Sequence, residues 1–163
     1  MKILGLILIF ASSTAQGFIR ASAHTDALKR LRGLIDLLYF IKREISSYLT
    51  PQGEIFEKFR NRDLEKCGFL EALRGADSLN PLYQALGSRG DTLLIKREAF
   101  DTLLSFSKEL GCFSPEEECA RCDRAIAELE DILKIQKEET AEKTRLCRTV
   151  GAMVGMGAVL MLW

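Results

Sequence analysis

Two hydrophobic patterns divide the chain. In residues 1–19 and 149–163, at the two ends, apolar residues follow one another with few interruptions, whereas in residues 20–148 they recur at steps of three and four. A continuous apolar run is typical of a membrane segment, and the three-and-four spacing is typical of an amphipathic helix. The pattern therefore predicts an all-α protein with three parts: an N-terminal transmembrane anchor (1–19), a cytoplasmic helical bundle domain (20–148) and a C-terminal transmembrane segment (149–163).

The terminal runs are nearly as long as a bilayer core is thick. Residues 3–19 carry no charge and would form a helix of about 26 Å, against a hydrocarbon core of roughly 30 Å. Residues 149–163 give about 22 Å, which reaches further if the stem of Arg148 extends toward the membrane surface. Gly151 and Gly155 have the spacing that lets two membrane helices approach closely, and we assign both glycines to membrane packing.

A cleaved signal peptide is the competing interpretation of the first segment. Lys2 would be its charged start, residues 3–11 its apolar region, and residues 13–15 its small-residue cleavage site. The anchor is favoured because no Pro or Gly cluster separates it from the helix-compatible stretch that follows. The five cysteines, an odd number, favour a reducing compartment, where no thiol needs a partner.

The charges beside the two segments predict their orientation. Lys and Arg outnumber acidic residues just inside the first segment, over residues 20–32, and just before the second, over residues 142–148. The positive-inside rule therefore places residues 20–148 in the cytoplasm, although Lys2 adds one positive charge on the opposite side.

The apolar spacing within residues 20–148 predicts about six helices. The first, over residues 28–49, ends at Thr50 and Pro51, and no breaker separates it from the N-terminal segment. The last begins near Ser114 and meets no breaker before Gly151. We expect these two helices to be long, antiparallel and continuous with the terminal transmembrane segments. Shorter helices are expected over residues 55–64, 69–73, 82–86 (ending at the glycines of 87–90) and 93–110.

The start of the last helix carries a specific capping signal. Ser114 provides the N-cap, Pro115 takes the first helical position, and Glu117 completes a capping box three residues on. Gly111 closes the preceding helix as a C′ residue. Beyond the cap, a seam at steps of three and four predicts the buried face of the last helix: Cys119, Cys122, Ile126, Leu129, Leu133 and Gln136.

Composition and charge exclude several functional classes. The 23 basic and 23 acidic residues give a formal net charge of zero, which does not suit a protein that binds nucleic acid. The only histidine, His24, has no catalytic partner in view, and the glycines of 87–90 lack the Gly-Lys-Ser/Thr of a phosphate-binding loop. We expect no enzymatic activity, no cofactor and no nucleic-acid partner.

The remaining chemical candidate is a pair of cysteines. Cys119 and Cys122 have the two-residue gap of zinc ligands, and other cysteines are available to complete a set of four thiolates. Helical spacing explains the pair more simply, because both thiols lie on the apolar seam, where a free cysteine behaves as a small hydrophobe. A Cys-based metal-binding or redox helical membrane protein is therefore the alternative function.

The layout resembles a known family. Its elements are the N-terminal anchor, the stretch from Glu44 to Pro51, the sequence of residues 106–111, the long charged last helix and the Gly-rich C-terminal segment. Together they resemble stage III sporulation protein AB over nearly the whole chain. The resemblance assigns the family-like turns to Glu44, Pro51, Leu110 and Gly111. The chain departs from the family pattern in the cysteines at the start of its last helix and in Gln52 and Gly53.

The resemblance implies a non-enzymatic function. It implies a component of the channel complex between mother cell and forespore, in the mother-cell membrane around the forespore, in contact with lipid and with other membrane components of the channel. Its cytoplasmic domain would be similar to that of the inner-membrane platform proteins of type II secretion and type IV pilus systems. The implied partner is a cytoplasmic secretion-type ATPase, stage III sporulation protein AA of the same operon. For its docking we select charged residues near the membrane-distal turns: Glu54, Arg60 and Arg62.

Overall fold

The computed structural model describes residues 25–47, 52–76 and 78–162, and their side chains in residues 25–47, 54–76 and 78–141. The chain divides into two compact units. One consists of residues 1–26 and 135–163, and the other of residues 27–134. Across the described ranges every regular element is a helix, which confirms the predicted all-α class.

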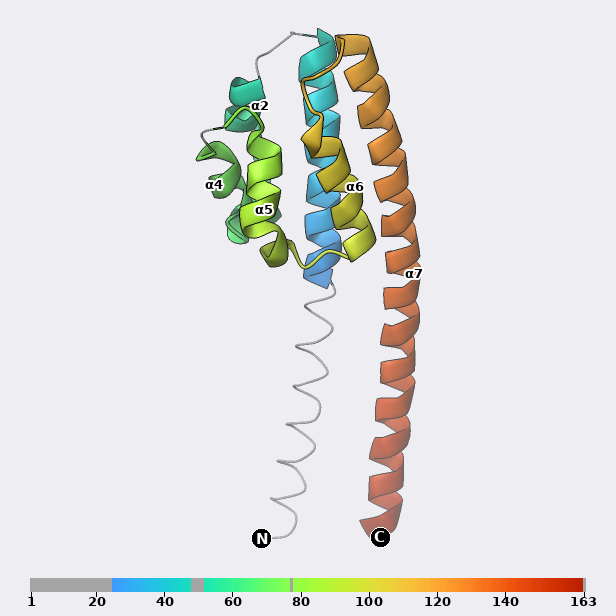
Figure 1. Cartoon of the computed structure of the whole chain (residues 1–163). Helices are drawn as coiled ribbons and strands as arrows, with labels where there is room; N and C mark the ends of the chain where they lie inside the picture. Colours follow the sequence, from blue (N-terminus) through green and yellow to red (C-terminus); the bar gives the residue numbers. More distant parts are fainter. Residues whose placement is uncertain (1–24, 48–51, 77, 163) are drawn as a thin grey trace. The chain divides into compact units, whose positions relative to one another are not determined.

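Seven helical segments are present in the described residues, against about six expected. The first covers residues 25–47. The others are α2 (Gln52–Lys58), α3 (Arg62–Lys66), α4 (Phe69–Arg74), α5 (Pro81–Leu93), α6 (Arg97–Lys108) and α7 (Pro115–Leu162) (Figure 1).

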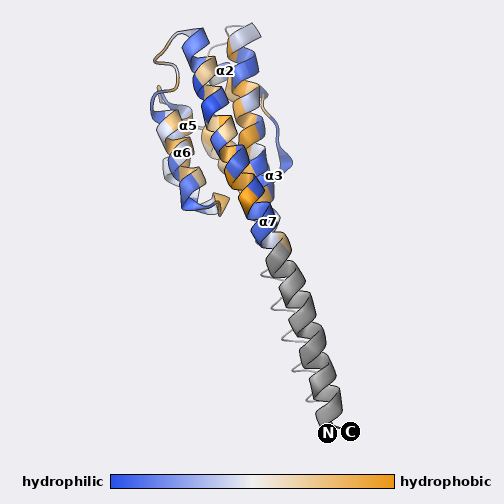
Figure 2. Ribbon diagram, turned by 90° about the vertical axis from the view of Figure 1, so that its right-hand side faces the viewer, coloured by the Kyte–Doolittle hydropathy of each residue, from blue (hydrophilic) through white to orange (hydrophobic). Residues whose placement is uncertain are grey.

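The unit of residues 27–134 is held together by one hydrophobic core. All seven helices contribute buried apolar side chains, and the helices carry their hydrophobic and hydrophilic residues on different faces (Figure 2). Full burial of one such side chain contributes roughly 1.5–3 kcal/mol. On α7 the predicted seam is buried from Cys122 to Gln136, whereas Cys119 is half-buried. Representative core residues are Leu34, Leu38, Phe56, Leu64, Phe69, Leu86, Leu103 and Leu129.

The 25–47 helix and the first part of α7 are antiparallel, as predicted. Lys42 Nζ lies 2.6 and 2.7 Å from the two carboxylate oxygens of Asp123, and the Tyr39 hydroxyl donates to Glu130 Oε1 at 3.0 Å. The residue number therefore falls along one helix while it rises along the other. The hydrogen bond to Asp123 raises the pKa of Lys42, and the hydrogen bond to Glu130 raises the pKa of Tyr39.

The single helix predicted over residues 55–64 is wrong, because the chain breaks it into α2 and α3. Asn61 is the N-cap of α3, and its side-chain oxygen accepts hydrogen bonds from the backbone N–H groups of Asp63 and Leu64. A short amide side chain that satisfies the free N–H groups of a new helix ends the previous one. Gly33 on the 25–47 helix leaves room for it: a Cβ there would lie 3.0 Å from the Asn61 oxygen.

The predicted boundaries of α5 and α6 are also wrong. Helix α5 does not stop at the glycines of 87–90 but continues to Leu93, and α6 begins at Arg97 rather than near residue 93. Gly90 is a packing residue instead of a breaker, because a Cβ there would lie 2.4 Å from the ring of Phe100 on α6. The turn between the helices occurs at Leu94, which adopts a left-handed conformation with φ +55°.

The predicted terminal segments are only partly within the described residues. Residues 1–19 and Pro51 lie outside them, while Gly151 and Gly155 lie in the last part of α7. Among the residues that were described, no helix combines the length and the apolar character that crossing a membrane requires.

Candidate functional site

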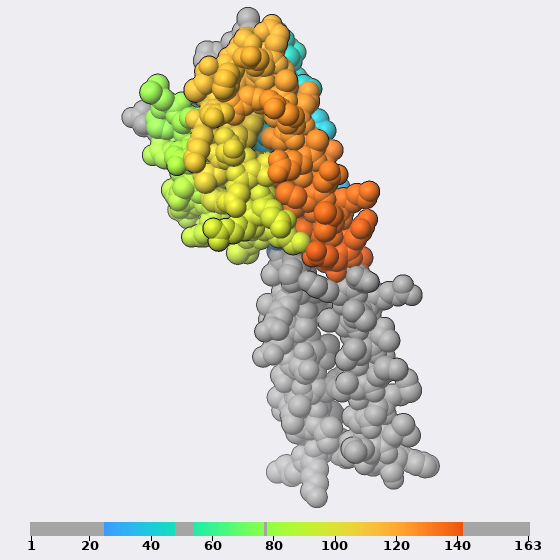
Figure 3. Space-filling view, turned by 45° about the vertical axis from the view of Figure 1, so that its right-hand side comes forward, coloured from blue at the N-terminus to red at the C-terminus, as the bar shows by residue number. Residues whose placement is uncertain are grey.

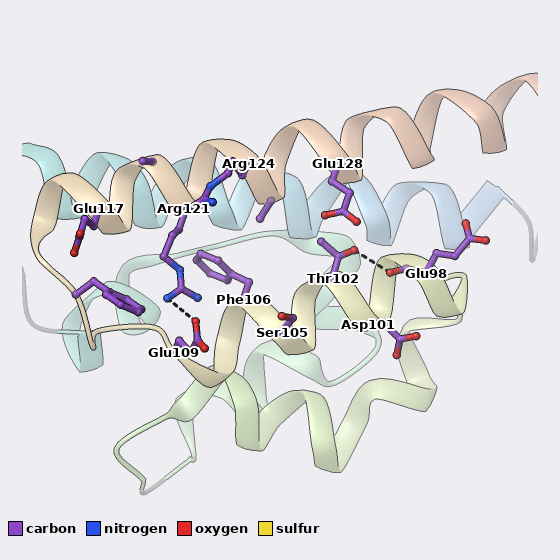
Figure 4. Close-up of a pocket in the computed structure, with 13 residues that line it drawn as sticks. Glu98, Asp101, Thr102, Ser105, Phe106, Glu109, Glu117, Arg121, Arg124 and Glu128 are labelled. Atoms are coloured by element: carbon purple, nitrogen blue, oxygen red, sulfur yellow. Dashed lines mark hydrogen bonds and ion pairs between the residues drawn. The ribbon is translucent and has the colours of Figure 1, made fainter.

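An open groove of about 870 Å³ lies between α6 and residues 117–128 of α7. Figure 3 shows the two helices side by side at the surface with a hollow between them, and Figure 4 shows the side chains that line it. Charged residues dominate the lining: Glu98, Asp101 and Glu109 from α6 and its end, and Glu117, Arg121, Arg124 and Glu128 from α7.

The groove is acidic although the whole chain is neutral. Five carboxylates against two guanidinium groups give the lining a formal charge of −3, whereas the formal net charge of the chain is zero. The groove therefore concentrates negative charge on one face of the unit. A surface of this sign attracts and orients a basic partner.

One end of the groove is built around Arg121. Its Nη1 atom lies 2.9 Å from Glu109 Oε2, and its guanidinium carbon lies 4.6 Å from the centre of the Phe113 ring. The arginine side chain is only 14% exposed, while Phe113 is 45% exposed. Phe106, which is buried, completes the wall (Figure 4). At this end charge is neutralised and an aromatic surface is left accessible.

The other end of the groove carries the excess of acidic residues. Glu98 and Asp101 come from α6, and Glu128 comes from α7 on the opposite wall (Figure 4). All three are exposed. Asp101 has a loose surface pair with Arg97 at 3.8 Å. Among the described residues, the carboxylates of Glu98 and Glu128 have no ion-pair partner.

The turn between α6 and α7 connects the two walls of the groove. Gly111 has φ +86°, in the left-handed region that glycine adopts without strain, and Leu110 beside it is buried. Ser114 Oγ accepts from the backbone N–H of Glu117 at 3.4 Å, which confirms the predicted N-cap. The predicted C′ position of Gly111 is wrong by one residue, because the C-cap of α6 is Glu109.

Sequence reasoning missed Glu118, which lies four residues after the predicted N-cap at Ser114. The side chain is 2% exposed, and its Oε1 atom accepts the backbone N–H of Gly111 at 2.7 Å. Its Oε2 atom is buried without a hydrogen-bond partner among the described residues. A charge-assisted bond of this kind ties the turn to the first part of α7.

The residues selected for ATPase docking lie elsewhere, on α2, α3 and their connection. Glu54 pairs with Lys58 at 3.6 Å, and Arg62 is exposed at the start of α3. Arg60 donates to the backbone carbonyls of Phe59, at 3.0 Å, and Glu57. Arg60 therefore also has a structural role.

Glu44, assigned by resemblance to a family-like turn, is a buried carboxylate within the first helix. It is 6% exposed, and one of its oxygens lies 3.7 Å from Arg43 Nη2.

The cysteine pair has unfavourable chemistry for a metal or redox site. Cys122 is buried, and that burial, with a smaller contribution from the carboxylate of Glu118, raises its pKa to about 12. A metal ligand or redox nucleophile needs the thiolate, which the environment of Cys122 disfavours. Among the described residues, no three His, Cys, Asp or Glu side chains are grouped to hold a metal ion.

Comparisons with known proteins agree on one family. The family model of stage III sporulation protein AB matches residues 2–163. A curated relative, stage III sporulation protein AB of Bacillus subtilis (strain 168), is 22% identical over 169 residues, which cover 99% of each protein. A solved structure of stage III sporulation protein AB (SpoIIIAB) matches with a TM-score of 0.56 at 22% identity, covering 71% of this chain and 97% of the other, and shows a similar fold. The chain therefore belongs to the stage III sporulation protein AB family.

Proposed function

We propose that this chain is a non-enzymatic platform component of the channel complex between mother cell and forespore, and that its helical unit docks a cytoplasmic secretion-type ATPase. The observation that carries the proposal is the family match over residues 2–163. The all-helical unit of residues 27–134 is consistent with a docking module, because it presents long rigid helices.

The proposed location is the mother-cell membrane around the forespore, with residues 20–148 in the cytoplasm. The uncharged runs at both ends of the sequence and the basic residues beside them support it. Helix α7 runs without a break from Pro115 to Leu162. A continuous helix is stiff along its axis, so a movement imposed on one end by a docked motor is transmitted further than through a flexible linker.

Co-purification tests the docking. The tagged full chain, extracted with detergent from membranes of sporulating cells, is expected to retain stage III sporulation protein AA through washing. Absence of the ATPase, from preparations in which the chain is intact and folded, would overturn the proposal.

A charge reversal tests the docking face that the sequence suggested. Arg62→Glu is expected to reduce the amount of retained ATPase, because Arg62 is exposed and free to pair with a partner. Arg60 is a poorer choice, since its reversal also removes hydrogen bonds to the backbone. Lys134→Glu on α7 is the matched control with the same charge change. Equal retention in both variants would remove the α2–α3 face from the proposal.

A further inference from the structure

The acidic residues on the two sides of α7 differ in whether they have a partner within the unit. On the side that faces the 25–47 helix, Asp123 and Glu130 each have a partner within the unit, Lys42 and Tyr39. On the side that faces α6, Glu128 of α7 and Glu98 of α6 line the two walls of the groove, and neither has an ion-pair partner in the described part of the chain. Both carboxylates are exposed. They are therefore available to a cation from outside.

The groove also has an apolar contact surface. The ring of Phe113 is 45% exposed at its rim, and Phe106 forms part of the wall. An accessible aromatic ring beside a hollow is a typical anchor point for a partner side chain, because burying it removes apolar area from water. The guanidinium of Arg121 stacks on Phe113 and restricts the ring before any partner arrives.

The size of the groove fits a peptide segment better than a small ion. A volume of about 870 Å³, open along its length between two helices, accommodates side chains of a helix or an extended segment. An occupant that matches the groove therefore carries positive charge at the acidic end and an apolar group at the end that holds Phe113.

We propose that the α6–α7 groove binds a segment of a partner protein that carries two or more Lys or Arg residues and one large apolar side chain. The basic residues pair with Glu98, Asp101 and Glu128, and the apolar side chain packs on Phe113. This inference rests on the proposed function in one respect: the partner is a protein of the channel assembly, whether the ATPase or another component.

Site-specific photo-crosslinking from the full chain in membranes of sporulating cells tests the inference. The photo-reactive residue replaces Ser105, which is exposed and lines the groove, and in a control it replaces Gln84, which is exposed on α5. The expected product at position 105 is a crosslink to a protein segment with at least two Lys or Arg residues, identified by mass spectrometry of the crosslinked peptide.

Charge variants connect the crosslink to the acidic residues. The triple variant Glu98→Lys, Asp101→Lys and Glu128→Lys is expected to lower its yield by about tenfold or more, the lower end of what electrostatic steering supplies. The matched control Glu57→Lys, Glu71→Lys and Asp131→Lys changes the total charge equally on exposed residues outside the groove, and should leave the yield unchanged. The neutral variant Glu98→Gln, Asp101→Asn and Glu128→Gln, which avoids new positive charges and any unfolding they cause, should give an intermediate loss.

The outcomes separate this inference from the docking of the ATPase. A crosslink to a neutral or acidic segment or to lipid, no crosslink at position 105, or equal yields from the groove and control triples would overturn the groove inference, even if the ATPase co-purifies. A charge-dependent crosslink to a basic segment of another channel component would support it, even if the ATPase does not co-purify.

Discussion

Helix α7 has two neighbours within the unit of residues 27–134, and it meets them in different ways. Against the 25–47 helix its polar side chains are matched, as in the Lys42–Asp123 pair and the Tyr39–Glu130 hydrogen bond. Against α6 it leaves an open groove with a formal charge of −3. Both neighbours share the hydrophobic core with α7, so the difference lies in the polar side chains. They are paired on the first side, whereas on the second they line a groove that has room for a partner.

The largest difference in stability is expected between two side-chain truncations on α7, one in the core and one in the groove. Leu129→Ala removes a fully buried side chain from the core and should lower the free energy of unfolding by about 2–5 kcal/mol. Glu128→Ala, one residue away in the groove, should change it by less than about 0.5 kcal/mol, because Glu128 is exposed and lacks a partner. Urea denaturation of the purified chain measures both. Comparable losses would mean that the groove acids stabilise the fold.

The turn that connects the groove walls is expected to be the next most sensitive point. Glu118→Ala leaves the N–H of Gly111 without its acceptor and should cost about 1–3 kcal/mol in a denaturant titration. Glu118→Gln keeps an oxygen acceptor and should retain most of that stability. Glu116→Ala on the exposed face is the control. A loss for Glu116→Ala as large as that for Glu118→Ala would contradict the role given to the buried carboxylate.

Substitutions of two glycines in α5 test how closely α6 packs against it. Gly90→Ala places a Cβ 2.4 Å from the Phe100 ring, so either the ring or the two helices must shift, at a cost of about 1–3 kcal/mol. Gly87→Ala meets nothing within 4 Å and should stabilise the helix by about 0.5–1 kcal/mol. Thermal unfolding should shift in opposite directions for the two variants. Shifts of the same sign would show that α6 adapts to α5 without strain.

Local features of the fold could be predicted from the sequence because their causes lie within a few residues. The seam from Cys122 to Gln136 follows from helical periodicity, the N-cap at Ser114 from its own hydroxyl, and the positive φ of Gly111 from its missing side chain. Each depends on the chain next to it.

The features that sequence reasoning missed depend on residues far along the chain. Gly90 is a helix interior position because Phe100 packs on it, and the sequence alone shows only a glycine. Asn61 begins a helix in a stretch whose apolar pattern continues through it. The one available signal for Glu118 is its register: it lies one turn before Cys122, on the buried face.

The candidate site was even less accessible to sequence reasoning. The acids of α7 alternate with basic residues, as is typical of a solvated helix face, and nothing in that pattern singles out Glu128. The groove exists only because α6 brings Glu98 and Asp101 to the opposite wall.

The pH dependence of stability should report the burial of Cys122. Its pKa is raised from 9.0 to about 12 in the folded chain, so above pH 9 the unfolded thiol ionises while the folded thiol does not. The unfolded state then binds fewer protons, and stability falls with rising pH by up to about 1.4 kcal/mol per unit. The chain with Cys122→Ala should show a shallower fall between pH 9 and 11 than the unmodified chain, and Cys112→Ala, an exposed thiol, should not. Identical slopes in all three proteins would place the Cys122 thiol in contact with water.

The smallest effect on stability is expected at the Lys42–Asp123 pair, which joins α7 to the 25–47 helix. Lys42 and Asp123 are bonded through both carboxylate oxygens, but their side chains are 35% and 55% exposed, so water competes for both charges. A double-mutant cycle with Lys42→Met and Asp123→Asn should give a small favourable coupling at low salt that disappears in 1 M salt, where the screening length falls to about 3 Å. A cycle between Lys42 and Asp131, an exposed acid elsewhere on α7, is the control and should give none. A Lys42–Asp123 coupling that persists in 1 M salt would mean that the pair is shielded from solvent. The matched charges would then hold the interface directly, and the contrast between the two sides of α7 would be electrostatic as well as steric.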